Sequence, residues 1–437
     1  MRLRVLTATG VLADHGLLGP DVGALSGVLL RPFLDLLGDT GPINARTTRY
    51  AGLSVGADDP DWLAPQGNVK RALRPNLIRE TGFTDYDVTW PSQLPEHLVT
   101  DPWRALSESV ARRSGLDPDA RYRVVCALYR VGLFRAAVDV AGTPSTDEIA
   151  ADDRTGLTAL RAASAMSKLG HSTHSLVPYS VRVYDHAPSG GRARLAAAVN
   201  LAIHFGRATR DRAATELWSA RVDEETARLS PGDSDVDALL ESVALRAACF
   251  GAFVRGDHAD VARTLERAWE LGCRVRANQR VPAVLAEENR YALLETRINA
   301  AVARGDREAA LTYSAALTEH DPLEPRAWLQ LGAVHTDDGR IAEALAAFQE
   351  AVTLGAPTSG AAWYCVARSQ EMLGDLPAAC HAYGSSVAAQ PLGLTALLGL
   401  HRTAAATGRA TLADWARLRL EHLRGAVKRP LAADETR

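Results

Sequence analysis

Two histidines three residues apart, His171 and His174, are the first side chains in this sequence whose type and spacing could support chemistry. On one turn of helix, both imidazoles could reach the same metal ion. A zinc site needs three or four protein ligands, however, and the nearest further candidates, Asp185 and His186, are distant in the sequence. We therefore expect a polar loop or helix end here, and no metal site.

Aspartates and arginines in the N-terminal part of the chain form another candidate set, because converging carboxylates and guanidiniums could act on a substrate. Nothing in their spacing requires that they converge, and the sequence lacks the HExxH, GxSxG, P-loop and GxGxxG motifs. We therefore expect no catalytic residue and no cofactor. An enzyme with an unrecognised N-terminal site, or an accessory subunit of a biosynthetic enzyme, stays as an alternative. The residues concerned are Asp58, Asp59, Asp61, Arg71, Arg74, Asp85 and Asp87.

The charge balance does not favour nucleic acid or membrane as a partner. The chain has 437 residues and a net charge of −3, so it offers no general attraction to polyanions. Its short basic runs lack interleaved aromatic residues, and no apolar run is long enough to span a membrane. Five cysteines, an odd number without CxxC spacing, suit a reducing compartment, and we expect a cytoplasmic protein. Abundant arginine and alanine indicate a GC-rich, actinobacterial-like genome and carry no functional information.

The first hundred residues differ from the remainder. Prolines punctuate residues 41–102 so densely that long helices and central strands are excluded there. Aromatic residues such as Trp62 and Trp90 are too frequent for a free linker. We predict an irregular, proline-rich arm at residues 1–100, of unknown fold.

Beyond residue 100 the sequence predicts one helix after another and no strand, which defines an all-α protein. The exception is 171–190, where a loop or a short helix are both possible. We divide the chain into degenerate helical repeats at 101–283, clearer repeats with a C-terminal cap at 284–425, and a flexible tail at 426–437.

Four glycines in the clearer part recur at nearly constant intervals. Gly305, Gly339, Gly374 and Gly408 are separated by 34, 35 and 34 residues, and each lies between two apolar, alanine-rich helical patterns. A fixed period of this length is typical of a solenoid, in which each repeat buries a face against its neighbour.

Two successive repeats agree at many fixed offsets. The matching positions are Trp328, Gly332, Gly339, Ala344 and Phe348 in one, and Trp363, Ala367, Gly374, Ala379 and Tyr383 in the next. This pattern resembles the tetratricopeptide repeat (TPR) family, most clearly over residues 322–391. The resemblance implies a right-handed superhelical solenoid of antiparallel helix hairpins. Small residues would let paired helices touch, aromatic rings would fill the gaps between hairpins, and the glycines would end the first helices in a left-handed conformation.

In the TPR family, the first helices of successive hairpins line a concave groove that takes peptides or partner helices. The resemblance places on this face Asn299, Leu329, Tyr364, Arg368, Leu398 and Arg402. Arg368 and Arg402 are 34 residues apart and should stack in one column, where two guanidiniums suit an acidic segment. Alternatively, each arginine forms an ion pair with Glu371 or Asp375, or is merely solvated.

The leading hypothesis is a non-catalytic scaffold or adaptor that binds a partner protein or peptide in this groove. The two arginines favour a partner with an acidic segment. The first alternative is a peptide- or ligand-responsive regulator. In that case the solenoid would close on a signal and change its grip on a target.

Overall fold

The computed structural model describes Leu17 and residues 89–169, 176–229, 234–274, 280–322, 324–354 and 359–428. All regular elements in this part of the chain are helices, and it contains no strand, so the predicted all-α class is confirmed. The predicted N-terminal arm lies outside the described residues, apart from Leu17 and its last residues, and so does the predicted tail beyond residue 428. So do the two histidines of the metal hypothesis and the N-terminal aspartates and arginines.

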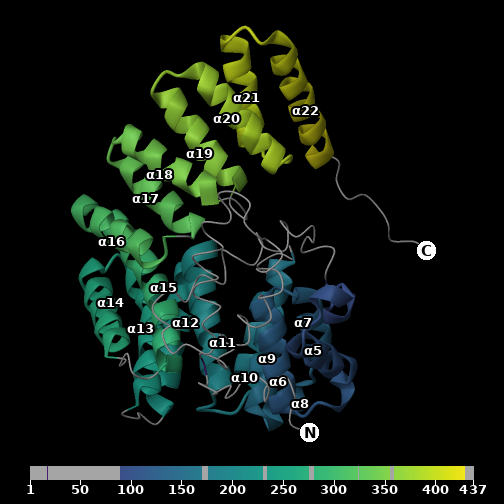
Figure 1. Ribbon diagram of the computed structural model, residues 1–437. Helices are drawn as coiled ribbons and strands as arrows, with labels where there is room; N and C mark the ends of the chain where they lie inside the picture. Colours follow the sequence, from purple (N-terminus) through teal and green to yellow (C-terminus); the bar gives the residue numbers. More distant parts are fainter. Residues whose placement is uncertain are drawn as a thin grey trace. The chain divides into compact units, whose positions relative to one another are not determined.

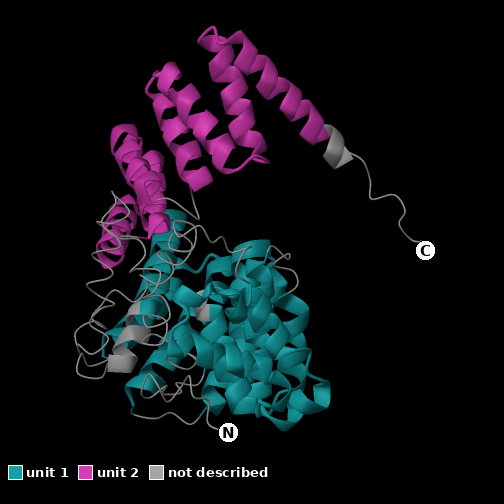
Figure 2. Cartoon of the chain, turned by 45° about the vertical axis from the view of Figure 1, so that its right-hand side comes forward, with its two compact units in different colours: residues 1–305 teal, residues 306–437 magenta. Residues whose placement is uncertain are grey.

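The chain divides into two compact units, residues 1–305 and 306–437 (Figure 2). The sequence analysis divides the chain at residues 100, 283 and 425. The division between residues 305 and 306 does not test these boundaries, which stay a prediction. No helix within the described residues is both long and apolar enough to cross a membrane.

In the first unit, short 3-10 turns precede or follow the first helix, at Pro91–Gln93, Glu96–Leu98 and Arg113–Gly115. The α-helices of this unit that the structure describes are α5 (Asp101–Ala111), α6 (Pro118–Val131), α7 (Phe134–Ala141), α8 (Thr146–Ala151), α9 (Asp153–Lys168), α10 (Leu176–His186), α11 (Arg192–His204), α12 (Arg212–Arg228), α13 (Asp235–Arg255), α14 (His258–Cys273) and α15 (Arg280–Arg304) (Figure 1). A π-helical turn, Phe205–Thr209, extends α11.

The second unit consists of helices that pack pairwise in chain order, as TPR hairpins do. They are α16 (Arg307–His320), α17 (Pro325–Asp337), α18 (Ile341–Leu354), α19 (Ser359–Met372), α20 (Leu376–Ala389), α21 (Leu394–Ala406) and α22 (Ala410–Lys428) (Figure 1).

One turn motif explains why the helices fold back on each other. Between α19 and α20, Gly374 adopts φ +84°, a left-handed conformation that ends the first helix. Asp375 then caps the second helix, because its carboxylate accepts a hydrogen bond of 3.0 Å from the backbone N–H of Ala378. The same Gly-Asp pair precedes α14 and α16, at 256–257 and 305–306.

Close helix contacts depend on glycine at two positions in the second unit. A Cβ atom on Gly332 of α17 would overlap the ring of Phe348 on α18, and a Cβ on Gly399 of α21 would overlap the ring of Tyr383 on α20. Both aromatic rings are buried in the core. A glycine that faces a ring therefore sets how closely these helices approach.

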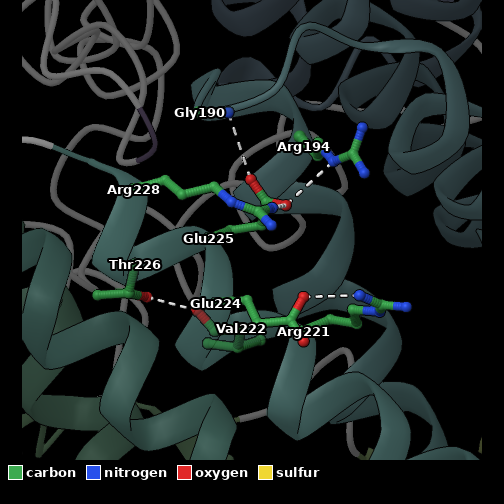
Figure 3. A network of polar contacts seen from close by, with 8 residues as sticks. All are labelled: Gly190, Arg194, Arg221, Val222, Glu224, Glu225, Thr226 and Arg228. Atoms are coloured by element: carbon green, nitrogen blue, oxygen red, sulfur yellow. Dashed lines mark hydrogen bonds and ion pairs between the residues drawn. The ribbon is translucent and has the colours of Figure 1, made fainter.

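A buried carboxylate joins three segments of the first unit (Figure 3). Glu225 on α12 is fully buried and pairs with Arg194 of α11 at 3.0 Å and with Arg228 at 2.5 Å. It also accepts a hydrogen bond of 3.4 Å from the backbone N–H of Gly190. Because a buried charge is costly unless it is paired, this network fastens the loop between α10 and α11 to α12.

Candidate functional site

The predicted groove residues of the second unit lie at helical spacing on the first helices of the hairpins. Tyr364 and Arg368 are one turn apart on α19, as are Leu398 and Arg402 on α21, and Leu329 lies on α17. Asn299 lies on α15, which belongs to the other compact unit, so it is described separately from this set.

Glu371 lies between the two predicted arginine positions and is held by two neighbouring helices. Arg402 of α21 donates two hydrogen bonds to its carboxylate, Nε to Oε1 at 2.8 Å and Nη2 to Oε2 at 2.7 Å. The hydroxyl of Tyr383, from α20, donates a third at 2.8 Å. Arg402 is thus paired with Glu371, which is the alternative considered above for this residue.

These contacts change the proton affinities of the groups involved. Partial burial raises the pKa of Glu371, but hydrogen bonds from Arg402 and Tyr383 outweigh it, so the net pKa lies below the ordinary glutamate range. Burial, and then the hydrogen bond to a carboxylate, raise the pKa of the Tyr383 hydroxyl. Glu371 is therefore ionised at neutral pH, and its ion pair is intact there.

Arg368 differs from Arg402 in what it contacts. It is exposed and forms no ion pair with any described residue. A hydrogen bond with Tyr364 is the largest of the causes that raise its pKa. The ring of Tyr364 lies 6.0 Å from that of Tyr383, and Leu398 is 39% exposed. An aromatic ring, an exposed cation and an exposed leucine thus lie on this predicted groove face.

The predicted repeat positions lie where the hairpins pack. Ala344, Phe348, Ala367, Ala379 and Tyr383 are buried, as is Gly332. The remaining positions are the partly buried Trp328, whose indole Nε1 donates to the Pro322 carbonyl at 2.8 Å, the partly buried Trp363, and the turn glycines Gly339 and Gly374, with φ of +77° and +84°.

A cavity of about 370 Å³ in the first unit was not anticipated from the sequence. Its described lining comes from α6, α9, α11, α13 and α15, together with Leu17. Helices α9, α11, α13 and α15 contact one another in that order. The polar residues that line it are Tyr122, Arg161, Ser164, Asn200, Arg246, Glu288 and Asn289. No motif in the sequence marks these residues, which lie on helices far apart in the chain.

The described residues contain no cluster of three or more histidines, cysteines, aspartates or glutamates that could hold a metal ion. The predicted absence of catalytic, cofactor and metal residues stays a prediction.

Residues 255–356 match the family model of the bacterial transcriptional activator domain (BTAD). That region is less than a quarter of the 437-residue chain. Comparison with curated proteins finds no match.

Among solved structures, the chain is similar to the MamA protein, with 16% identity over 44% of this chain and 97% of that one, at a TM-score of 0.34. It is also similar to YrrB, titled a TPR protein with an unusual peptide-binding site, with 18% identity over 45% of this chain and 88% of that one, at a TM-score of 0.31. The antiparallel hairpins, with their glycine turns and their small residues against aromatic rings, make the chain a TPR-like helical-repeat protein.

Proposed function

We propose that this protein is a regulator of transcription whose helical repeats bind a partner protein or peptide. The observation that carries the proposal is the similarity of residues 255–356 to the bacterial transcriptional activator domain. This region runs from the end of α13 to just beyond α18 and so contains complete helix hairpins. The similarity supports a regulator over a scaffold without a regulatory role.

The partner-binding part of the proposal rests on the TPR-like fold and on the face formed by α19 and α21. Tyr364, Arg368 and Leu398 on this face combine an aromatic ring, a cation and an apolar side chain, which is a composition typical of protein interfaces. In this proposal the exposed guanidinium of Arg368 contacts an acidic group of the partner.

We further propose that the chain acts on transcription through that partner and does not itself bind nucleic acid. The net charge of −3 favours this arrangement, because binding to DNA is driven largely by neutralisation of phosphates.

Deletion of the gene in the native host, followed by sequencing of its transcripts, tests the regulatory role. We expect a limited set of transcripts to change and to be restored by the wild-type gene. A variant Arg368→Glu should fold but fail to restore them, whereas Arg263→Glu, at an exposed position in the other unit, should restore them. An unchanged transcript profile on deletion would refute the proposed function.

A further inference from the structure

The cavity of the first unit is built from one face of each of several helices. Residues 161 and 164 of α9, 196, 199, 200 and 203 of α11, 243 and 246 of α13, and 288, 289 and 292 of α15 line it. Spacings of three and four residues place these side chains on the same face of their helix. At about 370 Å³, the cavity is within the size range of sites for small molecules.

Asn289 is the most informative residue of this lining. Its side chain is 5% exposed, and its amide Nδ2 donates a hydrogen bond of 2.7 Å to the hydroxyl oxygen of Ser242. Ser242 in turn uses its one proton to donate to the carbonyl of Ala268 at 2.6 Å, so it can only accept from Asn289.

This chain of hydrogen bonds fixes the orientation of the Asn289 amide. Its nitrogen must face Ser242, so its oxygen Oδ1 faces away from that contact, and Oδ1 has no hydrogen-bond partner among the described residues. A buried carbonyl oxygen without a partner costs about 1–3 kcal/mol. A ligand that donates an N–H or O–H group to Oδ1 would remove this cost.

The charged residues of the lining favour an anionic group elsewhere on the same ligand. The described lining contains two guanidiniums, of Arg161 and Arg246, and one carboxylate, of Glu288, so the formal charges of these described residues sum to one positive unit. Arg161 is held in place by the ring of Tyr129, whose centroid lies 5.0 Å from its guanidinium carbon. One carboxylate group matches this lining better than a dianion such as phosphate, which Glu288 would repel.

We propose that the cavity binds a small organic acid that carries one carboxylate and an N–H or O–H donor, as α-amino acids and α-hydroxy acids do. Arg161 and Arg246 bind the carboxylate, since guanidinium and carboxylate pair bidentately. Asn289 Oδ1 accepts the hydrogen bond from the amine or hydroxyl. This inference goes beyond the proposed function and does not depend on it.

Binding of a defined set of probes to the purified full-length chain tests the proposal. Thermal shift measurements would use the proteinogenic L-amino acids, their α-hydroxy analogues and inorganic phosphate. Calorimetry would then compare the tightest probe with its carboxamide and with the analogue that lacks the amine or hydroxyl. Binding of amino acids but not hydroxy acids, or the reverse, supports the proposal and identifies the donor. If no organic acid binds, or phosphate alone binds, the proposal is overturned.

Substitutions of lining residues test whether the probe binds in the cavity. Arg161→Gln and Arg246→Gln should each weaken the tightest probe at least about tenfold, because a hydrogen bond to a charged group is lost. Arg263→Gln, which alters an arginine that is 70% exposed on the surface of α14, should bind as the wild type does. Equal affinity of all three variants and the wild type would refute the cavity as the site.

The role of Asn289 can be tested separately, by a comparison of two ligands whose result differs from that of a general loss of structure. Removal of the ligand's amine or hydroxyl should weaken binding to the wild type about tenfold and leave binding to Asn289→Leu unchanged. Circular dichroism establishes that each variant is folded. If an arginine variant does not fold, the affinities of the wild type for the tightest probe and for its carboxamide still test the carboxylate contact. Equal affinity for these two ligands would overturn the proposal.

Discussion

Glu225 provides the sharpest test of how the first unit is held together. The substitution Glu225→Ala removes a carboxylate that is fully buried and leaves Arg194, Arg228 and the Gly190 N–H without their acceptor. Breaking a buried ion pair by removing one partner costs about 3–5 kcal/mol. Because the two arginine side chains are 23% and 45% exposed and can turn to water, we expect the lower end, about 3 kcal/mol.

The adjacent residue supplies a matched control. Glu224, one position earlier on α12, pairs with Arg221 at 2.6 Å, but these side chains are 44% and 41% exposed (Figure 3). An exposed pair of this kind contributes about 0.2–1 kcal/mol, so Glu224→Ala should have a small effect.

Hydrogen exchange followed by mass spectrometry measures the difference locally. A loss of about 3 kcal/mol corresponds to exchange about two orders of magnitude faster in peptides from α12 and from the loop that precedes α11. Glu224→Ala should change the same peptides less than about fivefold. If the two variants exchange alike, Glu225 is not the anchor of this loop and the reasoning is refuted.

Three further predictions follow from single residues. Gly332→Ala should destabilise the second unit by about 1–3 kcal/mol in urea unfolding through overpacking, whereas Gly384→Ala, a helix position with open space around it, should stabilise it by about 0.5–1 kcal/mol. Since the folded-state pKa of Glu371 is lowered, its contribution to stability is complete above the unfolded value of about 4.3 and is lost as the pH falls through the folded value. Comparison of the free energy of unfolding of the wild type and of Glu371→Gln as a function of pH measures this contribution of Glu371 to stability. Burial raises the pKa of the Cys249 thiol to about 12, so iodoacetamide at neutral pH should label the exposed Cys273 and leave Cys249 unmodified, as peptide mapping would show.

The sequence was sufficient to predict most helices of the second unit, because their hairpins are local. A turn glycine, a capping aspartate and an apolar helix face all lie within one repeat, so their spacing can be recognised in the sequence. The short helix α8 is harder to predict, because six residues show no hydrophobic period, although Ser145 and Glu148 form a capping box at its start. The sequence does not decide between a loop and a helix at α10, because Pro178 would interrupt the interior of a helix. In the structure Pro178 lies in the first turn, where no hydrogen bond is lost by its missing N–H.

The cavity could not be predicted from the sequence, for a physical reason. Its polar residues lie on helices between positions 122 and 289, and their distance in space depends on how the hairpins of the first unit stack. Neither the hydrophobic period nor the turn glycines specify that stacking. The sequence likewise allows several partners for Arg402, since Glu371 and Asp375 are both near it in the expected fold. Only the three-dimensional placement of α21 relative to α19 distinguishes them.

The pairing of Arg402 decides which substitution can test the groove. Arg402→Glu would place a second carboxylate against Glu371 and remove the ion pair that links α21 to α19, so a loss of partner binding would have two explanations. Arg368 forms no ion pair with a described residue, so Arg368→Gln removes a charge from the predicted groove and leaves the ion pair between Arg402 and Glu371 in place. We expect Arg368→Gln to weaken binding of a glutamate-rich peptide about tenfold at low salt, with an unchanged unfolding midpoint. Equal affinity of the variant and the wild type in fluorescence anisotropy would show that acidic segments do not bind at this face.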